Sequence, residues 1–189
     1  MESRQEKQVR SLKRLIIAGT TLNDIMQTTA ALKNIDAHGP HGPVYYMAFS
    51  GIAVAYCRIF DETNYGLGSI GKKYEKFPDD SEHANTHADL LEGRRTAFAH
   101  YSPAQAANLL RNAKDIQDHQ KVEMIVNLGG DVGFRAKIIL WKTKNLRKIY
   151  DLCAFQDERI RSDAKKLVEH LGGDKVYAPG TYTIGESFP

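Results

Sequence analysis

Two arginines and a histidine stand close together in the stretch RRTAFAH, residues 94–100. Metal-free cleavage of RNA needs a base for the 2′-hydroxyl proton, an acid for the leaving oxygen and a cation for the phosphoryl charge. Histidine suits proton transfer because its pKa lies near neutrality, and arginine suits phosphate because its fork of donors matches the phosphate oxygens. Arg94 or Arg95, together with His100, would therefore supply the parts of an RNA-cleaving site.

The alternative for this stretch is a solvated helix end, where cations are favourable. On a helix of about 100° per residue, His100 lies about 120° from Arg94 and about 140° from Arg95, so neither arginine shares its stripe. A distorted helix end or a long arginine side chain would have to close the gap. Spacing alone leaves both interpretations open.

Apolar periodicity and capping residues predict the helices that must position these groups. The predicted helices span about 5–35, 44–62, 81–100, 103–114 and 144–171. Asp80 or Ser81 can cap the third helix, and Pro103 fits the first turn of the fourth. The helix over 44–62 is apolar nearly all round, which is typical of a helix at the centre of a core.

One stretch changes its period and predicts strands. KVEMIVN (121–127) and FRAKIILW (134–141) are rich in β-branched and aromatic residues and flank the turn-forming LGGDVG. We therefore expect a small β-hairpin at about 121–141. Its Phe134 and Trp141 could stack on a nucleobase, although packing in the core or at a dimer interface is the alternative.

The glycine-rich stretch over 64–80 has no clear periodicity. Its GLGSIG has the spacing of a phosphate-binding loop, but it follows a predicted helix rather than a strand, so a mobile loop is the better interpretation. Together these elements predict a mainly α single domain over 1–172, an antiparallel bundle with an inserted hairpin. An irregular tail over 173–189 follows it.

Composition is that of an ordinary globular domain: 189 residues, 42% hydrophobic, 26% charged, with a net charge of +3. This mildly basic balance is compatible with RNA. Cys57 and Cys153 lack CxxC spacing and indicate buried, reduced thiols. The apolar run over 44–60 is interrupted and shorter than the roughly 20 residues of a membrane span. We expect a cytoplasmic protein with no membrane partner.

A second histidine pair invites a metal hypothesis. His83 and His87 stand four residues apart with Asp89 nearby, as in helical zinc sites. The segment HANTH lacks the glutamate of an HExxH motif, so an exposed polar helix face is the better interpretation. We predict no metal and no cofactor. A metal-dependent hydrolase that uses these histidines remains a third hypothesis.

CRIFDE (57–62) and RRTAFAH (94–100) resemble, in order and spacing, two signatures of the abortive-infection branch of the HEPN superfamily. There, a core helix ends in an arginine-bearing Leu-Phe-Asp-like sequence and a later helix carries an Arg-Asn-Lys-x-x-Ala-His-like motif. The resemblance covers roughly residues 5–172. It implies a HEPN-like helical domain and a homodimer whose paired motifs form one metal-free RNA-cleaving cleft. It also implies a toxin or phage-defence role, with an antitoxin or another protein as a further partner.

Carried over by position, Arg94 is the motif arginine, Arg95 takes the usual place of asparagine, and His100 is the general acid and base. In the alternative register, Arg95 is the motif arginine and Thr96 the polar residue. Arg95 in the place of asparagine also favours a rival function. This rival is a non-catalytic HEPN-fold module that dimerises and binds RNA, nucleotide or a protein.

Three further residues are candidates for auxiliary roles, and they are Arg58, Asp61 and Tyr101. Asp61 would orient His100 or an arginine, as carboxylates orient catalytic imidazoles. The alternative for Asp61 is an internal polar pair with Arg58, three residues before it. Tyr101 follows His100 directly, whereas a related branch places its regulatory tyrosine two residues after the histidine, so that regulatory role is not carried over.

Overall fold

The computed structural model describes residues 3–36, 39–62, 66–78, 81–94, 122–126, 132–136, 144–172 and 184. This part of the chain is mainly helical, as predicted. Its α-helices are α1 (Arg4–Leu32), α2 (Gly42–Ile59), α3 (Glu82–Gly93) and α6 (Lys144–Gly172), with a 3₁₀ helix η2 (Lys72–Glu75). The predicted helix over 103–114 and, apart from residue 184, the predicted tail over 173–189 lie outside the described residues.

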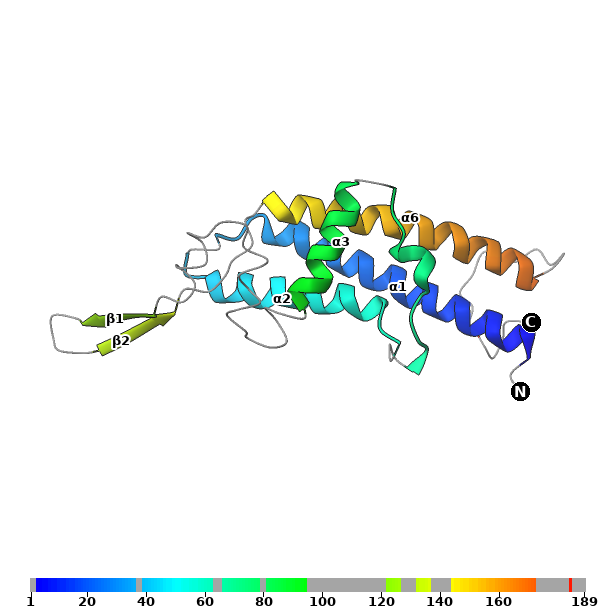
Figure 1. The fold of residues 1–189 in the computed structure, drawn as a ribbon, viewed down its shortest axis with the longest axis horizontal. Helices are drawn as coiled ribbons and strands as arrows, with labels where there is room; N and C mark the ends of the chain where they lie inside the picture. The colour runs from blue at the N-terminus through cyan, green and yellow to red at the C-terminus, as the bar shows by residue number, and fades with distance from the viewer. Residues whose placement is uncertain are drawn as a thin grey trace.

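Three long helices lie side by side, with α1 between α2 and α6 (Figure 1). Both neighbours run antiparallel to α1, which has its most extensive contact with α6. The shorter α3 crosses this layer and contacts both α2 and α6. The end of α3 is thereby held near the outer helices.

The two longest helices form where the periodicity predicts them. At the start of α1, the Ser3 hydroxyl accepts from the Glu6 N–H at 3.2 Å, and the Glu6 carboxylate accepts from the Ser3 N–H at 2.6 Å. This capping box satisfies two amides that a helix start leaves without partners. Further along α1, Leu15, Leu22 and Ile25 are buried on one stripe that faces the core.

The prediction that α2 is buried all round is wrong. Tyr45, Phe49 and other residues of one face are buried, but Val44, Met47 and Val54 are 57%, 70% and 45% exposed. Composition did not reveal this, because an apolar face reads the same in the sequence whether or not another element covers it.

The prediction of a mobile loop over 64–80 is also wrong for residues 70–78, which are anchored to the helices. Ile70 and Tyr74 are buried. The Tyr74 hydroxyl donates to the Asp163 carboxylate at 2.9 Å, and the Gln156 amide donates to the Tyr74 carbonyl at 2.7 Å. Two apolar anchors and side-chain hydrogen bonds hold this segment, and neither leaves a periodic signature in the sequence.

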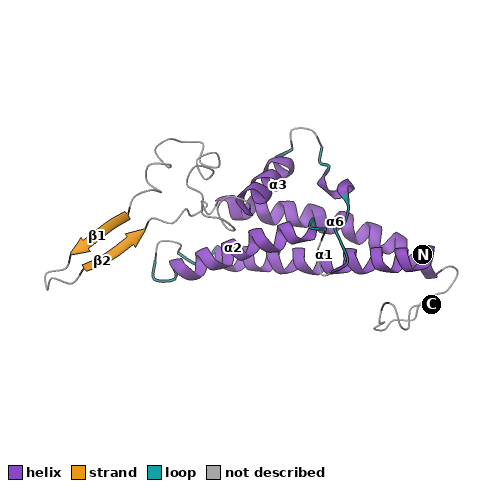
Figure 2. Ribbon diagram, turned by 60° about the horizontal axis from the view of Figure 1, so that its bottom comes forward, coloured by secondary structure: helices purple, strands orange, loops and turns teal. Residues whose placement is uncertain are grey.

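Strands β1 (Val122–Val126) and β2 (Val132–Ala136) pair antiparallel, with Met124 opposite Phe134. β1 lies within the first predicted strand, whereas β2 begins two residues before the second. Figures 1 and 2 draw the pair beyond the end of the bundle at which α2 begins.

Both cysteines are buried free thiols, as predicted. Burial raises the pKa of the Cys153 thiol well above its usual range, so it stays protonated and packs as a small apolar side chain. Among the helices described, none is long and apolar enough to cross a membrane.

Candidate functional site

The ends of α2 and α3 bring together one residue from each of the two motifs. Arg94 directly follows α3, and its guanidinium donates through Nη2 to the Asp61 carboxylate at 3.4 Å. The Arg94 side chain is 42% exposed and that of Asp61 is 27% exposed. A long, partly solvated pair of this kind contributes little to stability, about 0–1 kcal/mol.

Packing between α2 and α3 sets this proximity. The Cys57 thiol donates to the Leu90 carbonyl at 3.4 Å, one helical turn before Arg94. The rings of Phe60 and His87 meet edge to face, 4.9 Å apart. Because Phe60 immediately precedes Asp61, these contacts hold the carboxylate beside the end of α3.

The arrangement leaves Arg94 with capacity for a ligand. A guanidinium has five N–H donors, and the contact with Asp61 uses one of them. The carboxylate draws the guanidinium toward the end of α2. Such a pre-oriented arginine can bind a phosphate oxygen with little further loss of conformational entropy.

The remaining predicted site residues are placed as follows. Arg58 lies at an exposed position in the last turn of α2, directly before its final residue, Ile59. Asp61 contacts Arg94, and an arginine was one of the two partners proposed for this carboxylate. The other predicted site residues lie outside the described residues, and they are Arg95, Thr96, His100 and Tyr101, together with Trp141 of the predicted hairpin.

The prediction that His87 belongs to an exposed polar face is wrong. His87 is 7% exposed, and its ring contacts those of Tyr56, Phe60 and Phe77. Its Nδ1 lies 2.8 Å from the Tyr56 hydroxyl, and the imidazole tautomer decides which of the two groups donates. Spacing within α3 did not reveal this, because the aromatic partners come from distant segments.

Burial lowers the pKa of His87 to about 4, so the ring is neutral at physiological pH. The neighbouring His83 stacks on Phe155, with ring centroids 4.8 Å apart. Within the described ranges, no group of three or more histidine, cysteine or acidic side chains is arranged to hold a metal ion. The two histidines therefore pack α3 against aromatic rings.

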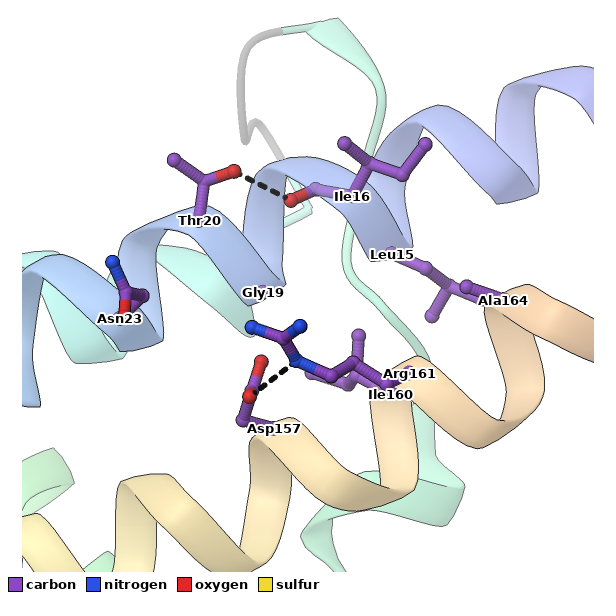
Figure 3. A pocket seen from close by; sticks show the side chains of 9 residues that line it. All are labelled: Leu15, Ile16, Gly19, Thr20, Asn23, Asp157, Ile160, Arg161 and Ala164. Atoms are coloured by element: carbon purple, nitrogen blue, oxygen red, sulfur yellow. Dashed lines mark hydrogen bonds and ion pairs between the residues drawn. The ribbon is translucent and has the colours of Figure 1, made fainter. Parts of the chain in front are cut away.

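A groove between α1 and α6 has a volume of about 300 Å³ and was not predicted (Figure 3). Apolar walls from Leu15 and Ile160 flank Asp157, whose Oδ2 accepts from Arg161 Nε at 2.6 Å. Gly19 opens the groove, because a Cβ there would lie 3.4 Å from Asp157 Oδ1. A glycine inside a strongly helical pattern was the available signal. The Asp157 carboxylate itself lines the groove, so the groove offers phosphate little attraction.

Comparison with known proteins gives no match: no family model fits the chain, and no curated protein or solved structure is significantly similar.

Proposed function

We propose that this protein is a HEPN-like, metal-independent endoribonuclease that acts in the cytoplasm as a homodimer. Its biological role in this proposal is that of a toxin or phage-defence effector, with an antitoxin or another protein as a regulatory partner. The contact between Arg94 and Asp61 carries the proposal. It joins the two motif segments, 33 residues apart, whose resemblance to HEPN signatures suggested the function.

Each residue has a defined task in the proposed reaction. His100 takes the proton from the 2′-hydroxyl and, with its counterpart in the partner subunit, returns a proton to the 5′-oxygen that leaves. The 2′-oxygen attacks phosphorus, the bond to the 5′-oxygen breaks, and a 2′,3′-cyclic phosphate remains. Arg94 or Arg95 stabilises the phosphoryl oxygens. Asp61 positions Arg94.

The exposed face of α2 supports the dimer. Val44, Met47, Gly51 and Val54 follow one another at spacings of three, four and three, and all are exposed. That is the spacing of a helix-pairing stripe. A Cβ added at Gly51 would meet nothing within 4 Å, so the backbone there is open to close approach. Since α2 leads into Asp61, a dimer in which the two α2 helices pair in parallel through this face would bring two candidate sites near each other.

Cleavage of a mixed RNA pool in EDTA tests the proposal. Wild-type protein should produce fragments that end in 2′,3′-cyclic phosphate, and chelation should leave the rate unchanged. His100→Ala and the Arg94→Ala/Arg95→Ala double variant should each lose at least about a hundredfold in rate. Intact RNA with all three proteins, each of them folded and dimeric, would contradict the nuclease.

The rival proposal is a non-catalytic HEPN-fold module that binds RNA, nucleotide or a protein. Arg95 favours it, because it occupies the place of the asparagine in the usual motif. The rival predicts RNA binding with no cleavage. It also predicts that His100→Ala leaves the affinity unchanged, whereas the nuclease loses its rate at the same substitution.

A further inference from the structure

Positive charge is concentrated in the first three turns of α1. Residues 4–14 hold five cations and one carboxylate, a net charge of +4, compared with +3 for the whole chain. The rest of the sequence therefore carries −1. Lys7, Arg10 and Arg14 follow one another at spacings of three and four, which places them on one face of the helix.

A hollow of about 500 Å³ lies on this charged segment. Arg10 and Lys13 line it, with Val9 and Leu67 as apolar neighbours and Ser3, Gln5 and Glu6 as polar ones. Glu6 opposes an anion, but its carboxylate already accepts from the Ser3 N–H in the capping box. The cations of the segment outnumber it five to one.

The loop after α2 closes one side of this hollow because Arg14 anchors it. Arg14 donates through Nη1 to the Ser69 carbonyl at 3.3 Å. The adjacent Gly68 has a φ of +84°, a conformation that favours glycine. Gly68 also lies close to the Glu62 carbonyl, one residue after Asp61. The basic segment is therefore linked through this loop to the neighbourhood of the candidate site.

We propose that the surface formed by Arg10, Lys13 and the loop around Leu67 binds the phosphate backbone of single-stranded RNA. Charge complementarity selects this occupant, since several adjacent cations match a chain of phosphates better than a single anion. Val9 and Leu67 provide apolar contact for a ribose or base. The choice of RNA rests on the proposed function, and the surface would guide the substrate toward Asp61 and Arg94.

Salt-dependent binding tests this surface. A labelled oligouridine of about 12 nucleotides is titrated with protein carrying His100→Ala, so that cleavage does not interfere. For single strands, each lost phosphate contact lowers the slope of log affinity against log salt by about 0.7. Arg10→Gln/Lys13→Gln should therefore lower the slope by about 1.4, and Arg10→Lys should leave it unchanged.

A matched control removes two cations at the other end of the bundle. Lys33→Gln/Arg147→Gln changes the net charge equally, but Lys33 lies about 30 Å from Lys13 along the helix axis. This variant should leave the slope unchanged. If the two double variants lowered the slope equally, the proposed RNA-binding surface would be overturned, because binding would then depend only on the net charge. If Arg10→Gln/Lys13→Gln does not fold, Lys13→Gln alone replaces it and should lower the slope by about 0.7.

Two further outcomes separate this surface from the proposed nuclease. RNA binding that depends on Arg10 and Lys13 without any cleavage by the wild-type protein would support the surface and contradict the nuclease. Cleavage by a protein whose affinity ignores both double variants would do the reverse. Binding to phosphatidylserine vesicles with no affinity for oligouridine would overturn RNA as the occupant.

Discussion

His87 and Arg94 stand seven residues apart along the α3 segment, about two helical turns, yet their surroundings differ. His87 is 7% exposed among aromatic rings, and its pKa of about 4 keeps it neutral. The Arg94 side chain is 42% exposed and contacts one carboxylate over 3.4 Å. The same helix thus buries one ionisable group and presents another. Burial suits a group to packing, while partial exposure beside a positioning carboxylate suits a group to binding a substrate.

The largest expected effect comes from the exposed face of α2, because the candidate site at Arg94 and Asp61 is proposed to depend on a dimer through this face. Met47→Glu adds a carboxylate to the apolar face and, in a symmetric dimer, opposes two of them, which costs several kcal/mol. Met47 is 70% exposed, so the fold should tolerate the change. Sedimentation should show a monomer, and cleavage should fall at least about a hundredfold. Ile16→Glu, at another exposed apolar position, is the control. A Met47→Glu variant that is dimeric and fully active would contradict a site formed jointly by the two subunits through this face.

The free energy of unfolding should depend on pH because of His87. Its pKa is about 4 in the folded state against about 6.5 when unfolded, so the unfolded chain binds more protons between these values. The contribution is therefore complete above pH 6.5 and is lost as the pH falls toward 4, by about 3 kcal/mol. Urea unfolding across this range measures it. A His87→Phe variant that keeps the full slope would show that other groups cause it.

Tyr56→Phe tests whether the buried contact between Tyr56 and His87 serves stability rather than catalysis. The change leaves Nδ1 of His87 without the partner 2.8 Å away, at a cost of about 1–3 kcal/mol. The rate of RNA cleavage should stay within about twofold of wild type once the temperature is well below melting. A large loss of rate with normal stability would instead assign this pair to the chemistry.

The smallest effect on stability should come from Asp61→Asn. The pair with Arg94 is half-exposed, so the free energy of unfolding should change by less than about 1 kcal/mol. Cleavage should nevertheless fall about tenfold, because Arg94 loses the carboxylate that orients it. Asp151→Asn, which removes the exposed partner of Arg147 on α6, is the control and should change neither quantity. An unchanged rate in Asp61→Asn would contradict the positioning role.

How far the sequence reveals this fold depends on how local the signal is. The spacing of Leu15, Leu22 and Ile25 predicts α1, and a cap at Asp80 or Ser81 predicts the start of α3, because both signals lie within a few residues. The Ser81 hydroxyl does accept from the Ala84 N–H at 3.1 Å. Contacts between distant segments leave no such signal.

His87 in α3 and Arg94 directly after it both illustrate that limit. Tyr56 and His87 are 31 residues apart, and no pattern within either helix indicates that they meet. The contact between Asp61 and Arg94 was anticipated only through the family resemblance, which offered an arginine as one of two partners for the carboxylate. The sequence does not predict the exposed face of α2 for a related reason, since its residues do not reveal what packs against them.

The most direct test of the account compares the two histidines in one experiment. Single-turnover cleavage in EDTA and thermal melting are measured for His87→Phe and His100→Ala beside the wild type. We expect His100→Ala to lose at least about a hundredfold in rate with an unchanged melting temperature. His87→Phe should instead keep its rate within a few-fold and alter the melting temperature. A catalytic loss in His87→Phe, with full activity in His100→Ala, would contradict the account.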